Sequence, residues 1–380
     1  MKIKNILFIS SWFPNKVEPS NGNFVQRHAE AVSRRHHVEV LHAIGDYDQK
    51  EKYVVDDKMI NGIRTLIVYY RNSGNPFQNF YRRMKSYQLG FSRIQKPDLV
   101  HANVLHNSML FAVYLKKKFK IPFVVTEHWT AFQEEDLEKT SFFIKQTAKY
   151  ISGNAEFILP VSCNLKDSLI LMGITTPMKV ISNVVNTDVF TIKTKEEDNT
   201  VKFLHVSSLI ARKRPLDIIN AVVKLHSKGF KVSLEIGGDG DTEPLLSLVK
   251  EKNAEDYIKV FDAVRYHEVA EKMQKSDYLI LFSENETQGC VILESFACGI
   301  PVISTKVGGA AELIIDGLSV GVEKNNTNHL NDVLERICEK KYTFKDQNEI
   351  RQFCVDRYSV DAIEKQFSEV YDEVYKNSHL

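Results

Sequence analysis

From Tyr278 to Val302 the chain reads YLILFSENETQGCVILESFACGIPV. An apolar run opens this stretch, and a polar loop, a largely apolar helical stretch and a Gly-x-Pro turn follow it. Short apolar runs that do not alternate with polar residues are typical of parallel strands buried on both faces. The stretch therefore predicts one strand–helix–strand unit of a parallel α/β sheet.

The same rhythm extends along the chain in both directions. In the first half it predicts strands at 6–10, 38–43, 63–69, 99–102, 123–127 and 157–161, and helices at 24–35, 78–94 and 107–119. In the second half it predicts strands at 202–206, 231–237, 258–261, 278–282, 301–304 and 319–322, and helices at 214–228, 241–252, 267–275, 291–298, 310–315 and 328–340. Two helices near 346–357 and 359–376 end the chain. Strands that alternate with helices favour doubly wound, Rossmann-like sheets.

The length of 380 residues favours two domains, at roughly 100–200 residues each. The segment Val184–Asn199 ends in polar and charged residues, which makes it the candidate linker between domains at 1–190 and 191–358. The hydrophobic share of 43% and the charged share of 26% exclude collagen-like, disordered and disulfide-scaffold chains. The net charge of +1 shows no nucleic-acid-like excess.

The charge is divided unevenly between the halves. Residues 1–190 hold 25 Lys and Arg against 17 Asp and Glu, and residues 191–380 hold 25 against 32. This split is typical either of two units with different partners or of drift on two solvated surfaces. The five cysteines have no C-x-x-C spacing, the N-terminus lacks signal-peptide features, and no apolar run reaches about 18 residues. We therefore expect a cytoplasmic protein without a disulfide framework or a zinc site.

Two carboxylates in the opening stretch are candidate ligand-binding groups. Glu286 lies in the loop after a buried strand, and Glu294 lies inside the following apolar helix. A carboxylate is costly to bury without a partner, so the pair could hold two hydroxyl-rich parts of one ligand. Gly289 would let the backbone approach a phosphate at the start of the helix. The alternative is a surface Glu and a second Glu that complements the helix dipole.

The stretch resembles the signature of the retaining, nucleotide-sugar-dependent glycosyltransferases of family four. Glu286, Glu294 and Gly299-Ile300-Pro301-Val302 match its pattern, as does the following Gly308-Gly309-Ala310-Ala311-Glu312. The resemblance implies the GT-B fold, in which two Rossmann-like domains face each other across a cleft. It implies that Glu286 lies beside the transferred sugar and that Glu294 contacts the ribose of the donor. The donor-binding residues that it implies on this stretch are Thr287, Gln288, Gly289, Cys290, Val291 and Glu294.

A second constellation is the basic run Arg212-Lys213-Arg214, which lies between a strand and a helix. Cations at a helix N-terminus need a counter-anion, and a diphosphate leaving group would supply one. The alternative is a solvated basic turn. The family pattern is G-R-L, three residues, then K-G; Lys213 takes the lysine position, and Ser208 stands where the arginine usually stands. Arg212 could supply the missing charge as a catalytic cation beside Lys213, and Arg214 replaces the glycine.

The first domain contributes two further candidates. His128 ends a buried strand, and it resembles the family histidine that touches the transferred sugar; a lone histidine is otherwise usually structural. Gly22 lies in a turn before a helix, and it resembles the family glycine that approaches the donor phosphates or the acceptor. For His101 we favour a structural role. The resemblance also implies that the last helix, about 359–380, packs back on this acceptor-binding domain.

No cofactor and no metal are expected beyond the nucleotide-sugar substrate. Two D-x-D triplets, Asp46-Tyr47-Asp48 and Asp239-Gly240-Asp241, read as ordinary turns. Basic clusters at 82–85 and 116–120 read either as solvated helix faces or as a contact with an anionic membrane at its inner face, since family acceptors are often lipid-linked. No nucleic-acid partner is expected.

The resemblance thus implies a retaining glycosyltransferase that acts on a saccharide or lipid-linked acceptor in polysaccharide or glycoconjugate synthesis. No side chain is an obvious nucleophile, which favours front-face attack assisted by the donor phosphate. Two alternatives remain: a nucleotide-sugar epimerase of the same architecture, and a non-catalytic nucleotide- or carbohydrate-binding protein.

Overall fold

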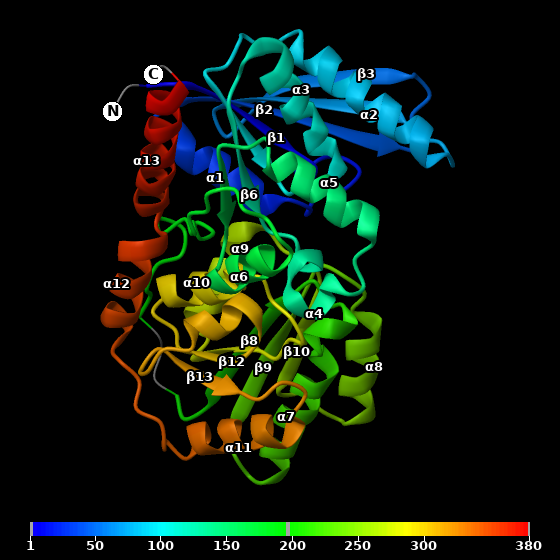
Figure 1. The fold of residues 1–380 in the computed structure, drawn as a ribbon. Coiled ribbons are helices and arrows are strands. Elements are labelled where there is room, and N and C mark those ends of the chain that lie inside the picture. The colour runs from blue at the N-terminus through cyan, green and yellow to red at the C-terminus, as the bar shows by residue number, and fades with distance from the viewer. Residues whose placement is uncertain (1–2, 195–197, 379–380) are drawn as a thin grey trace. The chain divides into compact units, whose positions relative to one another are not determined.

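A computed structural model describes residues 3–194 and 198–378 (Figure 1). The chain forms two compact units: unit 1 comprises Met1–Val184 and Asp361–Leu380, and unit 2 comprises Val185–Val360. The first boundary lies before the expected residue 190 because Val185 and Phe190 are buried in the hydrophobic core of unit 2. The first residues of the expected linker therefore belong to the core of unit 2. Residues 195–197 of that linker lie outside the described residues.

Unit 1 is built on one sheet with the strand order β3-β4-β2-β1-β5-β6-β7. The strands are β1 (Asn5–Ser10), β2 (His37–Asp46), β3 (Tyr53–Ile60), β4 (Ile63–Arg71), β5 (Leu99–Asn103), β6 (Phe123–Glu127) and β7 (Phe157–Pro160). All neighbouring pairs are parallel except β3 and β4, which are antiparallel. Every residue of β5, β6 and β7 is buried, as the continuous apolar runs predict.

Strand β3 was missing from the sequence prediction. It forms a hairpin with β4 through Asn61 and Gly62, whose φ angles are 49° and 80°. An Asn-Gly pair between two strands favours this two-residue turn, because both of its central residues need positive φ. The polar residues Asp56, Asp57 and Lys58 hid the strand, since they break the apolar run on which the prediction relied.

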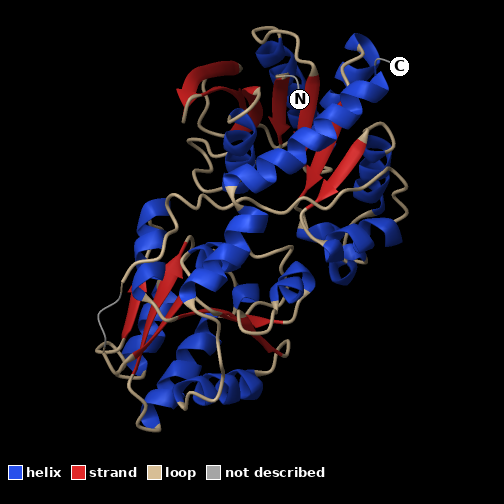
Figure 2. Cartoon of the chain, turned by 90° about the vertical axis from the view of Figure 1, so that its left-hand side faces the viewer, coloured by secondary structure: helices blue, strands red, loops and turns tan. Residues whose placement is uncertain are grey.

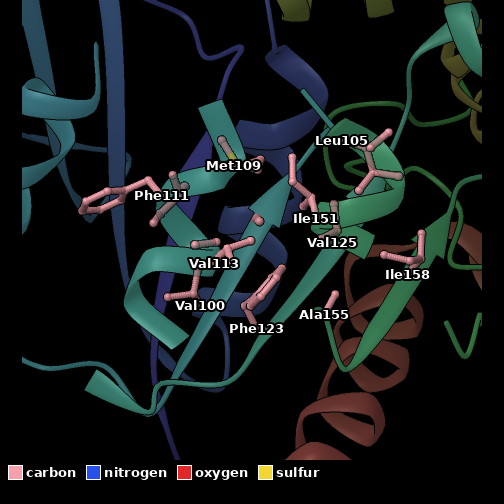
Figure 3. Close-up of a cluster of buried hydrophobic side chains, with 14 of the residues drawn as sticks. Val100, Leu105, Met109, Phe111, Val113, Phe123, Val125, Ile151, Ala155 and Ile158 are labelled. Atoms are coloured by element: carbon pink, nitrogen blue, oxygen red, sulfur yellow. The ribbon is translucent and has the colours of Figure 1, made fainter. Parts of the chain in front are cut away.

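Helices cover the sheet of unit 1 and close its core. They are α1 (Asn23–Ser33), α2 (Pro76–Phe91), α3 (Leu110–Phe119), α4 (Glu134–Leu137), α5 (Phe142–Ser152), α6 (Cys163–Leu171) and α13 (Val360–Ser378), with short 3-10 turns η1 (Asn107–Met109) and η2 (Thr130–Phe132). Figure 3 shows side chains of β5, β6, α3 and α5 interdigitating in this core. The C-terminal helix α13 is tied to unit 1 by the hydrogen bond of Tyr371 with His101, at 2.6 Å, and by the ion pair of Asp372 with Lys4.

Unit 2 has a fully parallel sheet with the strand order β10-β9-β8-β11-β12-β13. Its strands are β8 (Val201–Ser207), β9 (Val232–Gly238), β10 (Ile258–Phe261), β11 (Tyr278–Leu281), β12 (Val302–Thr305) and β13 (Ser319–Val322). Its helices are α7 (Pro215–Ser227), α8 (Glu243–Glu251), α9 (Tyr266–Lys275), α10 (Cys290–Ala297), α11 (Thr327–Cys338) and α12 (Gln347–Tyr358), with 3-10 turns η3 (Ala211–Lys213) and η4 (Gly308–Leu313). The helix expected at 310–315 is thus the 3-10 turn η4. Figure 2 shows helices packed along the strands, and the core divides into two clusters, one for α7, α8 and α11 and one for α9, α10 and α12.

Both sheets have a topological switch point, where the strand order reverses. It lies between β1 and β5 in unit 1 and between β8 and β11 in unit 2. In open α/β sheets, ligands bind beyond the carboxyl ends of the strands at such points. The loops that follow β1, β5, β8 and β11 are therefore where functional side chains are to be sought.

Candidate active site

In unit 2, backbone hydrogen bonds join the loops that leave the switch point. The amide of Glu284, after β11, donates to the carbonyl of Arg212, after β8, at 2.8 Å. The amide of Gly309, after β12, donates to the carbonyl of Glu286 at 3.0 Å. Residues from three separate parts of the sequence thus form one surface at the carboxyl edge of the sheet.

Lys213 and Glu286 form an ion pair at this edge. The side chain of Lys213 is 14% exposed and that of Glu286 is 9% exposed, so both charges are largely withdrawn from water. The hydroxyl of Ser283 also donates to Oε1 of Glu286, at 2.8 Å. A carboxylate held by a cation and a hydroxyl has a fixed orientation, which a group that stabilises developing charge requires.

His205, which the sequence analysis missed, supports the loop after β8. Its Nδ1 donates to the carbonyl of Ile280 at 2.8 Å, and burial lowers its pKa to about 4, so the ring is neutral. Its Nε2 therefore accepts from the hydroxyl of Ser207, at 2.8 Å, and this hydroxyl accepts in turn from the amide of Leu209, at 3.2 Å. A histidine inside an apolar strand was the signal available in the sequence.

The three consecutive cations do not share one role. Arg214 has a left-handed backbone, with φ 49°, at the position where the family pattern has glycine. Its guanidinium donates to Asp217 and Asn325, at 2.8 and 2.7 Å, and lies over the ring of Phe282. Arg212 and Ser208 are exposed. Lys213 and Arg212 therefore remain the candidate cations, and Arg214 stabilises the turn.

Helix α10 begins at this surface. Gly289 precedes it with φ 80°, a left-handed conformation that favours glycine. The backbone amides of the first turn have no intrahelical acceptor and point toward the loop, as at every helix N-terminus. The remaining predicted residues of this stretch are the half-buried Thr287, Cys290 and Val291 and the buried Gln288 and Glu294.

In unit 1, Gly22 and His128 lie near the switch point. Gly22 caps α1 with φ 79°, and a Cβ atom there would lie 2.4 Å from the backbone of Trp12, so the turn requires glycine. The ring of His128 packs on Phe24 of α1, with 4.2 Å between ring centroids. Helix α1 thus connects the two predicted residues.

The imidazole of His128 is buried, yet its Nε2 has no hydrogen-bond partner among the described residues. Burial, together with His28 and His101, lowers its pKa well below the usual 6.5, so the ring is neutral. Unpaired buried polar atoms are uncommon in folded proteins and call for an explanation. By contrast, both ring nitrogens of His101 have partners, Tyr371 and Thr126, in agreement with a structural role.

Glu127, the residue before His128, is fully buried and was also missed. Its carboxylate accepts hydrogen bonds from the backbone amides of Leu105, His128 and Trp129. Burial raises its pKa to about 7, and the three amide donors act in the opposite direction. An acidic residue at the end of an apolar strand was the available signal.

The D-x-D triplets have local partners. Asp46 pairs with Lys16 at 2.9 Å and accepts from the amide of Asp48, and Asp241 accepts from the amide of Glu243. Within residues 3–194 and 198–378, no group of three or more His, Cys, Asp or Glu side chains is arranged to hold a metal ion.

Of the helices in the described part of the chain, none has both the length and the apolar composition that crossing a bilayer requires.

Comparison with known protein families gives two adjoining matches. Residues 22–189 match the model described as Glycosyltransferase Family 4, and residues 187–355 match the model described as Glycosyl transferases group 1. Each model corresponds to most of one unit.

Similar proteins are found both among known sequences and among solved structures. An uncharacterized glycosyltransferase of Methanocaldococcus jannaschii is 27% identical over 73% of this chain and 76% of its own length. One subunit of the phosphatidylinositol N-acetylglucosaminyltransferase of Homo sapiens is 22% identical over 94% of this chain and 77% of its own. Sucrose-phosphate synthase of Thermosynechococcus elongatus superposes with a TM-score of 0.79 at 16% identity, over 98% of this chain and all of that one. Anabaena HepE in complex with UDP and glucose has a TM-score of 0.74 at 18% identity, over 97% of this chain and all of that one.

Proposed function

Because the chain belongs to the family-four glycosyltransferases and has their GT-B fold, we propose that it transfers a sugar from a nucleotide-sugar donor with retention of the anomeric configuration. The observation that carries this proposal is the ion pair of Lys213 and Glu286 at the switch point of unit 2. The pair supports the proposal because the reaction would need a cation for the departing diphosphate and a carboxylate for the sugar.

Unit 2 is the proposed donor-binding domain. Lys213 and Arg212 would neutralise the diphosphate, whose negative charge grows as the bond to the sugar breaks. The amides that begin α10, after Gly289, add a second set of donors suited to phosphate oxygens. Glu294, buried one turn into α10, would accept hydrogen bonds from the ribose hydroxyls. HepE binds UDP, which makes a UDP-sugar the first donor to test.

We infer a front-face mechanism that needs no enzyme nucleophile. The bond between the anomeric carbon and the diphosphate oxygen breaks, and the acceptor oxygen forms its bond on the same face. The acceptor proton passes to the departing phosphate oxygen, so charge and atoms balance. Glu286 would stabilise the positive charge that develops at the anomeric carbon, and the neutral His128 would offer Nε2 to a sugar hydroxyl.

Unit 1 is the proposed acceptor-binding domain, and we propose a lipid-linked acceptor at an anionic membrane on the cytoplasmic side. The human relative is named for a phosphatidylinositol substrate. Helix α5 exposes Phe142, Phe143 and Ile144 at its N-terminus and carries lysines but no acidic residue. Lys117 of α3 donates to Tyr150 of α5, at 2.7 Å, and adds positive charge to the same face.

In the other basic cluster, at 82–85, the two arginines bond within the fold. Arg82 is buried and donates to the carbonyl of Arg71, and Arg83 donates to the hydroxyl of Tyr70.

Exposed aromatic rings beside lysines, as on α5, suit the interface of an anionic bilayer, where rings partition among the headgroups and lysines contact the phosphates. The apolar face of α5 therefore supports membrane contact better than the cluster at 82–85.

A donor screen tests the proposed function. Thermal shift measured with UDP-, GDP- and ADP-sugars should show a rise in Tm for one donor class, and the Lys213→Ala variant should abolish that rise. Nuclear magnetic resonance of the product made with a lipid-linked or saccharide acceptor should show the anomeric configuration of the donor. Conversion of the donor sugar without acceptor would instead identify an epimerase, and binding without any turnover would identify a non-catalytic protein.

A further inference from the structure

Glu127 links the loops that follow the neighbouring strands β5 and β6 of unit 1. It ends β6, and its side chain is fully buried. Oε1 accepts from the amides of His128 and Trp129, at 2.8 and 2.6 Å, and Oε2 accepts from the amide of Leu105, at 2.6 Å. One carboxylate thus holds the loop that follows β6 and the loop that follows β5.

The loop after β5 has a conformation that its sequence disfavours. Val104 has φ 69°, in the left-handed region, which is a genuine outlier for a β-branched residue. Such strain costs about 1–3 kcal/mol, and it persists only where the surrounding structure enforces it. The bonds of Val104 N to the Thr126 carbonyl, at 2.8 Å, and of Leu105 N to Glu127 enforce it here.

The carboxylate is chemically specific for this arrangement. Three N–H donors converge on it, and both of its oxygens accept. A glutamine would offer one acceptor oxygen, and its NH₂ group would face an N–H donor at the other position. A buried charge is costly, so a carboxylate at this site indicates that both loops must be held at once.

We propose that Glu127 is the positioning residue for His128, and that its carboxylate aims the Nε2 of that ring, which has no partner among the described residues, toward the sugar by fixing the loops that follow β5 and β6. This inference rests on the proposed role of His128. Glu127 itself touches no substrate. It acts through the amide of His128 and through the strained turn at Val104, which brings His106 against Trp129, with 5.9 Å between ring centroids.

A double-mutant cycle tests the proposal. The variants Glu127→Gln, His128→Ala and the double variant are compared with the wild type by steady-state kinetics and by UDP binding. Glu127→Gln should lower kcat by about 10- to 100-fold, since a displacement of 1 Å can cost about 100-fold. The Kd for UDP should not change, because the proposed donor site lies in unit 2. The double variant should have the kcat of His128→Ala alone, since Glu127 has nothing left to position.

Asp98→Asn is the matched control. Asp98 also accepts from a backbone amide, that of Asn5 at 2.8 Å, but at the opposite edge of the same sheet, and its loss should leave kcat unchanged. If Glu127→Gln does not fold, the cycle is run with Glu127→Asp, which keeps the charge and both acceptor oxygens.

The outcomes separate the two proposals. Wild-type kcat in the Glu127 variant, or losses that multiply in the double variant, would overturn the positioning role while leaving that of His128 intact. A loss in the Glu127 variant with normal kcat in His128→Ala would overturn both the role of His128 and the claim that Glu127 acts through it.

Discussion

At the residue scale, Glu286 and Glu294 lie in different surroundings. Glu286 lies in a loop and is held by Lys213 and Ser283, whereas Glu294 is buried within α10. In the proposed mechanism the first carboxylate faces a charge that develops only in the transition state. The second holds ribose hydroxyls whose geometry hardly changes during the reaction.

This difference predicts different kinetic defects. Glu294→Gln should mainly raise the KM for the donor, by roughly one to two powers of ten, because hydrogen bonds to a charged group contribute about 1.5–3 kcal/mol. Glu286→Gln should mainly lower kcat. Both are measured by varying the donor at saturating acceptor. Equal losses of kcat with unchanged KM in the two variants would refute this division.

A second prediction at this scale concerns the neutralisation of the diphosphate. If Lys213 and Arg212 supply the positive charge, activity should survive a chelator such as EDTA, whereas Lys213→Ala should lose most of its turnover. The measurement is the initial rate with and without EDTA. Loss of activity that manganese or magnesium restores would direct attention to the D-x-D triplets, which here bond to Lys16 and to local backbone amides.

At the element scale, α5 is the predicted membrane contact. Phe142 and Phe143 are 65% and 80% exposed, and full burial of such a ring stabilises by about 1.5–3 kcal/mol. Phe142→Ser with Phe143→Ser should therefore lower partitioning onto vesicles that contain phosphatidylglycerol by about two to four powers of ten. Co-sedimentation with vesicles measures the effect, and added salt should weaken binding of the wild type.

Helix α2 provides the control for α5. Its Phe77 is 86% exposed, but Arg82 on the same helix is buried within the fold. Phe77→Ser should bind vesicles like the wild type. An equal loss in the α2 and α5 variants would show that the contact is not specific to α5.

At the scale of the whole molecule, the two units differ in their buried histidines. Among the described residues, six histidines of unit 1 and one of unit 2 have a lowered pKa, chiefly because of burial: His28, His36, His42, His101, His106 and His128, and His205. A histidine with a lowered pKa stabilises the fold above its unfolded pKa of 6.5, and this stability is lost as the pH falls toward 4. For a fully buried ring such as His28 the loss is about 3 kcal/mol.

Unit 1 should therefore unfold before unit 2 on acidification between pH 6.5 and 4. Glu127 acts in the opposite direction, since a carboxyl with a pKa raised to about 7 stabilises the fold at low pH, but it is one group against six. Both tryptophans, Trp12 and Trp129, lie in unit 1. Tryptophan fluorescence should thus change at higher pH than the last part of the far-UV circular dichroism transition. Loss of the circular dichroism signal before the fluorescence change would contradict this order.

The sequence alone determined the fold class and most of the elements. Apolar runs located every strand except β3, and turn chemistry at Gly22 and Gly289 located helix starts that the structure confirms. These elements can be predicted from the sequence because apolar runs, the amphipathic pattern of a helix and the residues that favour positive φ are all patterns of residues close together in the chain. The charged strand β3 was missed although Asn61-Gly62 marked its hairpin.

Only the tertiary structure decided which side chains act together. In the structure Lys213 forms an ion pair with Glu286, whereas Arg214 donates to Asp217 and Asn325. The carboxylate of Glu127 accepts hydrogen bonds from the amides of three residues in two loops. Val185 and Phe190, which were expected in the linker, are buried in the core of unit 2. Lys213 and Glu286, Arg214 and Asn325, and Leu105 and Glu127 are far apart in the sequence, and the order of the strands brings the partners of each pair together at the carboxyl edge of a sheet. Local pattern carries no information on that order, because the same run of residues can form a strand at any position in a sheet.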